Sequence, residues 1–238
     1  MADQSEYRLR LKAFEKRVDV SFKNQKLLET AFTHRSYLNE ERKPEGEHNE
    51  RLEFLGDAVL ELAVTDYLFK TYPHATEGDL TAYRAALVNA VMLGGIAESI
   101  GMNECLLLSK GEAKDMGRAR ATILANTFEA VVGALYLDQG FAAASDFIER
   151  LVLSKMQEVI EKGSWRDAKS VFQELAQAKY AATPAYQTLR AEGPDHDKQF
   201  VVSVSVGERM VAEGEGKSKQ EAEQQAAERA LKKEEQNA

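Results

Sequence analysis

Hydrophobic and polar positions divide the chain into two parts with different periods. Up to about residue 160, apolar residues recur every three or four positions, and glycine and proline are sparse, which is typical of amphipathic helices. Pro73 and Gly78 separate the third predicted helix from the fourth, and Gly140 separates the fifth from the sixth. The predicted helices span residues 4–17, 25–38, 47–70, 77–99, 120–138 and 140–161.

The remainder of the chain has a different pattern, with strands between two helices. The stretch QFVVSVSV at 199–206 alternates and is rich in valine, which is a strand signal. Gly193-Pro194 and Gly207-Glu208 stand where turns are needed between strands. The predicted strands are 185–191, 199–206 and 209–216, and the flanking helices are 167–179 and 218–233.

The change of pattern near Gly163 sets the predicted domain boundary. Ser218 and Glu221 form a capping box that marks the start of the last helix. The second part then has the order α-β-β-β-α, which is that of a small α+β domain. We therefore expect an all-α domain at 1–162, a short linker at 162–166 and a small domain at 167–235.

Composition narrows the classes of protein that this chain can belong to. Apolar residues make up 44% and charged residues 29%, which is ordinary for a globular protein and excludes global disorder. No uncharged apolar stretch reaches the length of about 18 residues that a membrane span needs, so no membrane association is expected. The N-terminal segment is too charged for a signal peptide. The single cysteine, Cys105, cannot form an internal disulfide, which favours a reducing, cytoplasmic location.

The net charge argues, at first sight, against a nucleic-acid partner. The chain has 31 Lys and Arg against 39 Asp and Glu, which gives a net charge of −8. Phosphate binding depends on clustered Lys and Arg, and neither part of the chain is a basic tail. Contact with RNA or DNA would therefore require a local basic patch or the help of a metal ion.

The segment HNERLEFLGDAVLEL places an acidic stripe on the third predicted helix. Glu50, Glu53 and Asp57 fall on one narrow face at helical spacing. The opposite side is apolar and contains Leu52, Leu55, Val59 and Leu62. A solvated acidic face is the simplest interpretation of this pattern. The three carboxylates repel one another, however, and no lysine lies within the stripe, so a cation site is the alternative.

The fifth predicted helix contains one isolated acid. Between Ala121 and Leu137 the only charged residue is Glu129, and a helix that is apolar on nearly all sides belongs in a core. A carboxylate there is costly unless it pairs with an arginine, lies at an exposed seam or binds a cation. Asn126, one turn earlier, offers an amide oxygen. If this helix packs against the third one, their oxygens would suit Mg²⁺, which also takes phosphate oxygens as ligands.

The small domain contains candidate contacts to RNA. Its α-β-β-β-α order resembles the double-stranded RNA-binding fold, which reads the shape of a duplex across the minor groove. Gln173 and Glu174 lie on the first helix, and His196 lies in the loop after the first strand. Lys217 and Lys219 lie at the start of the last helix, where the helix dipole favours phosphate. The basic cluster is thin, so a surface with incidental lysines is an equally open interpretation.

Longer motifs connect both parts of the chain to one family. HNERLEFLGDAVL resembles the signature segment of bacterial ribonuclease III, and ILANTFEAVVGALYLD resembles the second acidic motif of that family. Three further segments match in kind and order: THRSYLNE, EGDLTAYRAALVN and GEAKDMGRARATILAN. The resemblance covers essentially the whole chain, and its core ERLEFLGDA is highly specific.

The resemblance implies an endonuclease that cuts double-stranded RNA in ribosomal and other structured precursors, leaving 5′-phosphate and 3′-hydroxyl ends. It implies a homodimer that depends on Mg²⁺, with Mn²⁺ as an alternative cation. Carried over by position, Asp57 and Glu129 are the catalytic pair, and the metal ligands are Glu53, Asn126 and Glu129. The remaining matches are contacts to RNA, namely Glu50, Gln173, Glu174, His196, Lys217 and Lys219.

Asn126 departs from the family pattern, which commonly has aspartate at this position. The amide offers one oxygen but no negative charge, which leaves the metal affinity and the number of bound ions open. An alternative function is therefore a double-stranded RNA-binding protein that cuts weakly or not at all. A helical scaffold with a solvated acidic face is a third, disfavoured by Glu129. The intact set of three carboxylates favours the nuclease.

Two further expectations concern the helix with the acidic stripe. Phe54 lies beside the stripe, where we expect a partner subunit to cover it, together with Leu55, in a homodimer. Glu61 falls back on the stripe one turn past Asp57, and we expect this side chain to be solvated.

Overall fold

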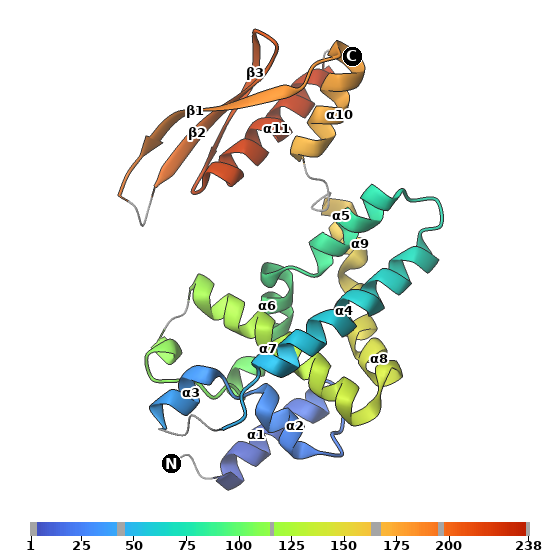
Figure 1. Cartoon of the computed structure of the whole chain (residues 1–238), viewed down its shortest axis with the longest axis vertical. Helices are drawn as coiled ribbons and strands as arrows, with labels where there is room; N and C mark the ends of the chain where they lie inside the picture. The colour runs from blue at the N-terminus through green and yellow to red at the C-terminus, as the bar shows by residue number, and fades with distance from the viewer. Residues whose placement is uncertain (1–3, 42–45, 115–116, 163–167, 195–197, 237–238) are drawn as a thin grey trace. The chain divides into compact units, whose positions relative to one another are not determined.

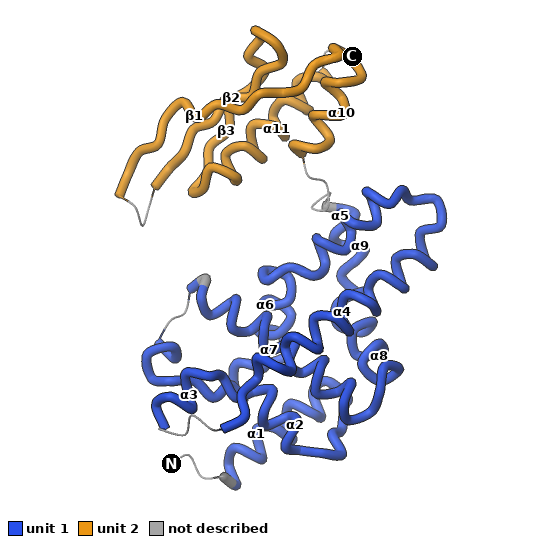
Figure 2. The backbone as a smooth tube through the Cα atoms, viewed as in Figure 1, with its two compact units in different colours: residues 1–165 blue, residues 166–238 orange. Residues whose placement is uncertain are grey.

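The protein consists of two compact units, residues 1–165 and 166–238, seen here in a computed structural model (Figure 2). The structure describes residues 4–41, 46–114, 117–162, 168–194 and 198–236. The predicted linker at 162–166 lies almost wholly outside these described residues. Each unit has a hydrophobic core of its own, as expected for separate domains.

The described part of the first unit is helical, as the sequence predicts (Figure 1). Its α-helices are α1 (Gln4–Arg17), α2 (Gln25–Ala31), α3 (Arg35–Glu40), α4 (Glu50–Thr71), α5 (Glu77–Leu87), α6 (Ala90–Ser99), α7 (Arg118–Gln139), α8 (Phe141–Leu151) and α9 (Met156–Lys162). Short 3-10 helices occupy Met102–Glu104, Glu112–Lys114 and Leu153–Lys155. In this part of the chain, the one β-type pairing is an isolated bridge between Thr33 and Leu107.

Three of the predicted helices are interrupted in the structure. Residues 25–38 form α2 and the start of α3, because His34 caps α3 by accepting a hydrogen bond from the Ser36 N–H. Residues 77–99 form α5 and α6, because the Asn89 side chain accepts hydrogen bonds from two N–H groups at the start of α6. Residues 140–161 form α8, a 3-10 turn and α9. A capping side chain satisfies the first amides of a new helix, so the chain can change direction at little cost.

The break between α5 and α6 also bears on membrane association. No described helix is by itself long and apolar enough to cross a membrane, and α5 with α6 meets that criterion only as a bent pair. Packing explains the apolar character of α6, because Leu93, Ile96 and Ala97 are buried in the core of the unit.

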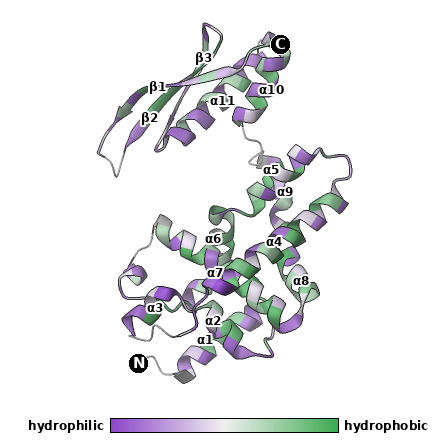
Figure 3. Ribbon diagram, in the orientation of Figure 1, coloured by the Kyte–Doolittle hydropathy of each residue, from purple (hydrophilic) through white to green (hydrophobic). Residues whose placement is uncertain are grey.

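The central helix of the first unit is α7, in agreement with its apolar sequence. Most of its length is buried, including Leu124, Phe128, Val131 and Leu135. Figure 3 shows more hydrophobic residues along α6 and α7 than along α1 at the edge of the unit. A helix that is apolar on most sides thus forms the axis around which the others pack.

The backbones of α4 and α7 touch where the two helices cross. A Cβ atom on Gly56 of α4 would lie 1.8 Å from the Glu129 carbonyl oxygen. A Cβ atom on Gly133 of α7 would lie 2.2 Å from the Leu52 carbonyl oxygen. Because any larger residue would separate the helices, these two glycines set the distance between α4 and α7.

One flank of α4 is less buried than its periodicity indicates. Leu52 and Val59 are buried and Leu55 is half-buried, as predicted. Leu62 was expected on the same side but is 58% exposed, because it lies at the edge of the core-facing side, toward Phe54. Phe54 itself is 81% exposed, in agreement with its predicted position beside the stripe.

The second unit has the predicted α-β-β-β-α order. An antiparallel sheet with the order β1-β2-β3 is covered on one face by the two helices (Figure 1). The elements are α10 (Ala168–Tyr180), β1 (Pro184–Glu192), β2 (Gln199–Val206), β3 (Arg209–Gly216) and α11 (Lys219–Gln236). Gly207, with φ +59°, makes the predicted turn between β2 and β3. Phe172, Val204 and Ala226 are fully buried between sheet and helices.

A buried carboxylate ties α11 to the rest of the second unit. Glu234 is 2% exposed and accepts hydrogen bonds from Lys179 Nζ at 2.8 Å and Tyr180 Oη at 2.6 Å. Arg209 Nη2 lies 3.5 Å from the other carboxylate oxygen. The hydrogen bond from Lys179, followed by that from Tyr180, lowers the pKa of Glu234. The cluster satisfies a charge that would otherwise be costly to bury.

We expect Gly133→Ala to destabilise the first unit by about 1–3 kcal/mol, because the added methyl group overlaps the α4 backbone. The matched control is Gly95→Ala, since a Cβ atom at this exposed helical position would meet nothing within 4 Å. The control should stabilise the protein by roughly 0.5–1 kcal/mol through helix propensity. Thermal unfolding followed by circular dichroism measures both, and equal stability of the two variants would contradict the close contact.

Candidate active site

The crossing of α4 and α7 gathers the acidic residues that the sequence singles out. Gly56 touches the backbone of Glu129, and Glu53 and Asp57 lie on either side of Gly56 along α4. The three carboxylates interact: both Asp57 and Glu53 raise the pKa of Glu129. The structure therefore brings together the predicted catalytic pair and the predicted ligand Glu53.

Glu129 has the most strongly perturbed carboxyl in this group. Burial first, and then the charges of Asp57, Glu53 and Glu61, raise its pKa to about 7. Raised carboxyl pKa values are typical of buried acids surrounded by like charges. A cation at this position would reverse the effect, because it favours the ionised form.

Asn126 lies next to Glu53 in the structure. The pKa of Glu53 is raised by burial, by Glu50 and by Asp57, whereas a hydrogen bond from Asn126 lowers it. The amide thus acts as a hydrogen-bond donor to a carboxylate, a role that its spacing along the chain did not indicate. Its oxygen is the atom that would be available to a cation.

The two ends of the acidic stripe are paired with protein cations. At the start of α4, Glu50 lies 3.6 Å from Arg35 Nη1 and 3.8 Å from His48 Nδ1. One turn past Asp57, Glu61 lies 3.0 Å from Arg84 Nε. The expectation that Glu61 is solvated holds in part: 41% of its side chain is exposed, but α5 packs beside α4 and places Arg84 against it.

The centre of the stripe has no such compensation. Within the described parts of the chain, no Lys or Arg forms an ion pair with Glu53, Asp57 or Glu129. Nor do any three described His, Cys, Asp or Glu side chains form a group that would hold a metal ion alone. Mg²⁺ usually binds one or two carboxylates and takes water and phosphate as its other ligands, so it does not need such a group. The uncompensated charge and the amide oxygen fit this kind of cation.

The segment THRSYLNE supports the start of α4. Asn49 is 1% exposed, and its N–H donates to the Thr33 carbonyl oxygen at 2.9 Å. The next residue after Thr33, His34, donates its N–H to the Leu107 carbonyl oxygen at 3.1 Å. Ser36 Oγ accepts a hydrogen bond from Ser109 N–H at 3.1 Å. These bonds fix the position from which Glu50 and the stripe begin.

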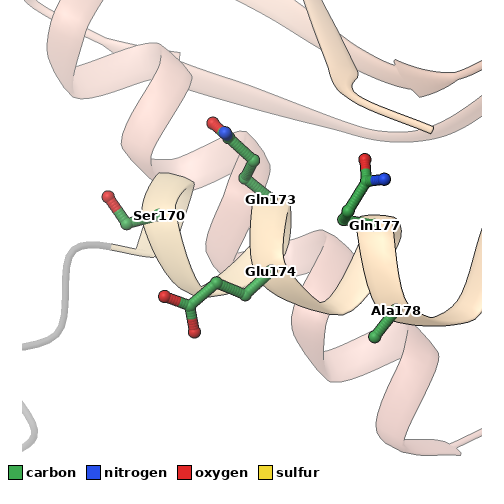
Figure 4. A pocket seen from close by; sticks show the side chains of 5 residues that line it. All are labelled: Ser170, Gln173, Glu174, Gln177 and Ala178. Carbon is green, nitrogen blue, oxygen red and sulfur yellow. The ribbon is translucent and has the colours of Figure 1, made fainter. Parts of the chain in front are cut away.

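In the second unit, the predicted RNA contacts lie on exposed helical positions. Gln173 and Glu174 are exposed on α10 and line a shallow hollow with Ser170, Gln177 and Ala178 (Figure 4). In this view Gln173 and Gln177 extend to one side of the helix and Glu174 to the other. The hollow offers mainly amide and hydroxyl groups, which are suited to hydroxyl-rich ligands.

The start of α11 is the second predicted contact in this unit. Lys217 and Lys219 are exposed, and Lys217 N–H donates to the Glu221 carboxylate at 2.8 Å. Ser218 Oγ accepts the Glu221 N–H at 3.1 Å, as predicted for a helix cap. The third predicted contact, His196, lies outside the described residues.

Arg84 and the glycines of the crossing were not recognised from the sequence as parts of the site. A glycine inside a helical pattern is a recognised sign of close packing, so Gly56 and Gly133 did carry a signal. Arg84 carried none, because it pairs with Glu61 from a different helix and no local spacing connects them.

Comparisons with known proteins agree with this architecture. A family model described as Ribonuclease-III-like matches residues 24–156, and one for the double-stranded RNA binding motif matches residues 168–234. Ribonuclease 3 of Bacillus cereus (strain G9842) is 46% identical over 233 residues, which cover 97% of this chain and 94% of that protein. Ribonuclease 3 of Borreliella afzelii is 44% identical over 228 residues, which cover 96% and 93%.

Among solved structures, the nuclease domain of ribonuclease III from Campylobacter jejuni is similar to the first unit. It is 38% identical, with a TM-score of 0.55, and the match covers 60% of this chain and 96% of that one. The helical unit thus matches ribonuclease III nuclease domains, and the α-β-β-β-α unit matches the double-stranded RNA binding motif. The chain therefore belongs to the ribonuclease III family, with the family's endoribonuclease domain followed by a double-stranded RNA binding motif.

Proposed function

We propose that the protein is a Mg²⁺-dependent endonuclease that cuts double-stranded RNA in the cytoplasm as a homodimer. Its substrates would be ribosomal and other structured RNA precursors, and its products would have 5′-phosphate and 3′-hydroxyl ends. The observation that carries the proposal is the group of Glu53, Asp57 and Glu129 at the α4–α7 crossing, which no described protein cation neutralises. The repulsion among these carboxylates opposes folding, and a protein that only binds RNA would have no use for them.

The residues at the α4–α7 crossing would have different roles in cation binding and catalysis. Glu53, the Asn126 oxygen and Glu129 would hold the cation, with Asp57 at the exposed side, facing the substrate. Mg²⁺, when bound, would supply a Lewis acid for the phosphoryl oxygen and lower the pKa of the attacking water. Glu50, paired with Arg35 at the start of the stripe, would lie toward the RNA.

The second unit would bind the RNA duplex. Gln173 and Glu174 line an exposed hollow of polar side chains on α10, suited to the 2′-hydroxyls of the minor groove. Lys217 and Lys219 at the start of α11 would contact phosphates, and His196 would belong to the same surface. Two lysines give a modest salt-dependent attraction, so a metal ion at the first unit would add to binding.

The proposed homodimer follows from the exposed end of α4. Phe54 is 81% exposed and Leu137 on α7 is 54% exposed, which is unusual for large apolar side chains that lie close together. Both line a groove with Leu27 and Leu55. The similar nuclease domain of ribonuclease III from Campylobacter jejuni is described as structurally flexible in a region involved in dimer formation. In this protein, a second copy of the chain would cover the groove.

Asn126 supports one other function, a protein that binds double-stranded RNA without cutting it. The amide donates to Glu53 and brings no charge to the site, so cation affinity would be reduced. Incubation of the protein with a long RNA duplex, with and without Mg²⁺, distinguishes the two. We expect Mg²⁺-dependent cleavage; a shift in gel mobility without cleavage at any Mg²⁺ concentration would support the binding protein instead.

Glu129→Gln should reduce cleavage of an RNA duplex by roughly a thousandfold or more, because it removes the charge of a ligand at the reacting phosphate. Duplex binding, measured in EDTA by gel shift, should stay within about twofold, because the second unit is unchanged and no metal ion contributes. Glu98→Gln, at an exposed position on α6, serves as a control and should cut normally. Substantial cleavage by the Glu129 variant would contradict its place in the site.

Thermal stability at different pH values tests Glu129 without any substrate. A carboxyl with a pKa of about 7 in the folded state contributes stability at low pH that is lost as the pH rises through 7. In EDTA, Glu129→Gln should therefore raise the Tm at pH 8, by roughly 2–4 °C for each kcal/mol. The difference should shrink below pH 5, where the wild-type carboxyl is protonated. A constant difference from pH 8 to pH 5 would contradict the raised pKa.

Asn126→Asp should lower the Mg²⁺ concentration for half-maximal cleavage, because a unit charge is added next to the cation. The same variant should have a lower Tm in EDTA, since the hydrogen bond to Glu53 becomes a repulsion. Mn²⁺, which binds nitrogen and oxygen ligands more tightly, should partly replace Mg²⁺ at low concentration in the wild type. Superimposable Mg²⁺ titrations of the variant and the wild type would exclude Asn126 as a ligand.

A further inference from the structure

Four carboxylates lie on the acidic stripe of α4, and the protein neutralises only the outer two of them. Glu50 is paired with Arg35, and Glu61 is paired with Arg84. Glu53 and Asp57 lie between them and have no ion pair with a Lys or Arg in the described chain. The stripe is thus divided into neutralised ends and a centre whose charge is left for an external cation.

Arg84 is held against α4 by two contacts. Its Nε lies 3.0 Å from Glu61 Oε2, and its Nη1 donates to Thr65 Oγ1 at 3.1 Å. The two acceptors lie on successive turns of α4, and the planar guanidinium presents donors in fixed directions. These contacts restrict the Glu61 carboxylate to the side of the helix that faces α5.

The helix that carries Arg84 is itself fixed. A capping box of Thr76 and Asp79 starts α5, with the Thr76 hydroxyl accepting the Asp79 N–H at 3.1 Å. The rings of Tyr72, after α4, and Tyr83, on α5, lie 5.5 Å apart. These contacts fix the position of α5. Arg84 therefore approaches α4 from a defined direction and pairs with Glu61 without any movement of α5.

Glu61 lies close enough to the central carboxylates to affect them. It follows Asp57 by one turn on the same stripe, so the two side chains are neighbours on the helix surface. Its charge is also one cause of the raised pKa of Glu129. Without Arg84, the Glu61 carboxylate would be free to turn toward the site and would add a full negative charge there.

We propose that Arg84 is a positioning residue, which cancels the charge of Glu61 and keeps this carboxylate out of the cation site formed by Glu53, Asp57 and Glu129. This inference rests on the proposed function, since it presupposes a cation at that site. It assigns opposite effects to the two partners: Arg84 weakens cation binding, and Glu61 strengthens it. With Arg84 and Glu61 both present, the cation affinity of the site stays close to that of Glu53, Asp57 and Glu129 alone.

The test is a double-mutant cycle on the full chain without RNA, with Mg²⁺ binding measured by isothermal titration calorimetry. Arg84→Met should bind Mg²⁺ about threefold to tenfold more tightly, as expected for the loss of one positive charge at partly screened range. Glu61→Gln should bind more weakly by a similar factor. The double variant should return to within about twofold of the wild type, because both charges are removed.

A merely structural role for the pair predicts a different outcome. If Arg84 and Glu61 only hold α5 against α4, both single variants weaken Mg²⁺ binding and the double variant does not restore it. The matched control is Lys70→Met, which breaks an ion pair of 2.7 Å with Asp66 farther along α4 and should leave the affinity unchanged. Arg84→Lys, which keeps the charge, should also stay close to the wild type.

The outcomes separate this inference from the proposed function. Unchanged affinity in both single variants, or weakening in both, overturns the role of Arg84 while the wild type still binds Mg²⁺ and cuts. A wild type that neither binds Mg²⁺ nor cuts overturns the proposed function, and the inference with it. If Arg84→Met does not fold, as judged by circular dichroism, Glu61→Gln and the double variant decide together. Weaker binding in Glu61→Gln that the double variant restores supports the proposal, and unchanged affinity in Glu61→Gln or a double variant that stays weak overturns it.

Discussion

The contact between Gly56 and the Glu129 backbone is the constraint on which the first unit depends. Packed helices usually lie 8–10 Å apart, and the absence of side chains at Gly56 and Gly133 lets α4 and α7 approach until their backbones touch. The acid on a mainly apolar helix is thereby placed among the acids of an amphipathic one. A hydrophobic interface thus holds like charges together, and the stability of the core opposes their repulsion.

Local patterns predicted much of this arrangement. The spacing of apolar and polar residues over short stretches of sequence was enough to predict the core helix α7, the acidic stripe and the strands of the second unit. The helix breaks at His34 and Asn89 could not be predicted from such patterns. A capping side chain competes with continuation of the helix, and tertiary contacts decide which of the two occurs. The Arg84 contact was equally hidden, since it depends on how α5 returns to α4.

Asn126 was located correctly from the sequence, but its role within the protein was not. Asparagine can donate and accept hydrogen bonds, and the sequence pattern indicated only its oxygen as a ligand. The structure adds the donated hydrogen bond to Glu53, which partly relieves a carboxylate that has no described cation beside it. One amide therefore lessens the repulsion within the site and limits the charge that the site presents to a cation.

The buried Glu234 gives the second unit a response to acid opposite to that of the first. Its pKa is lowered by Lys179 and Tyr180, so its contribution to stability is present at neutral pH and is lost as the pH falls through the folded-state value. Glu129, with its raised pKa, makes the first unit less stable as the pH rises toward 8. Between about pH 7 and pH 5, acid therefore relaxes the repulsion in the nuclease domain and leaves the contribution of Glu234 intact. Only stronger acid, below the ordinary glutamate pKa of 4.5, loosens the RNA-binding motif, so the order in which the two domains melt depends on pH.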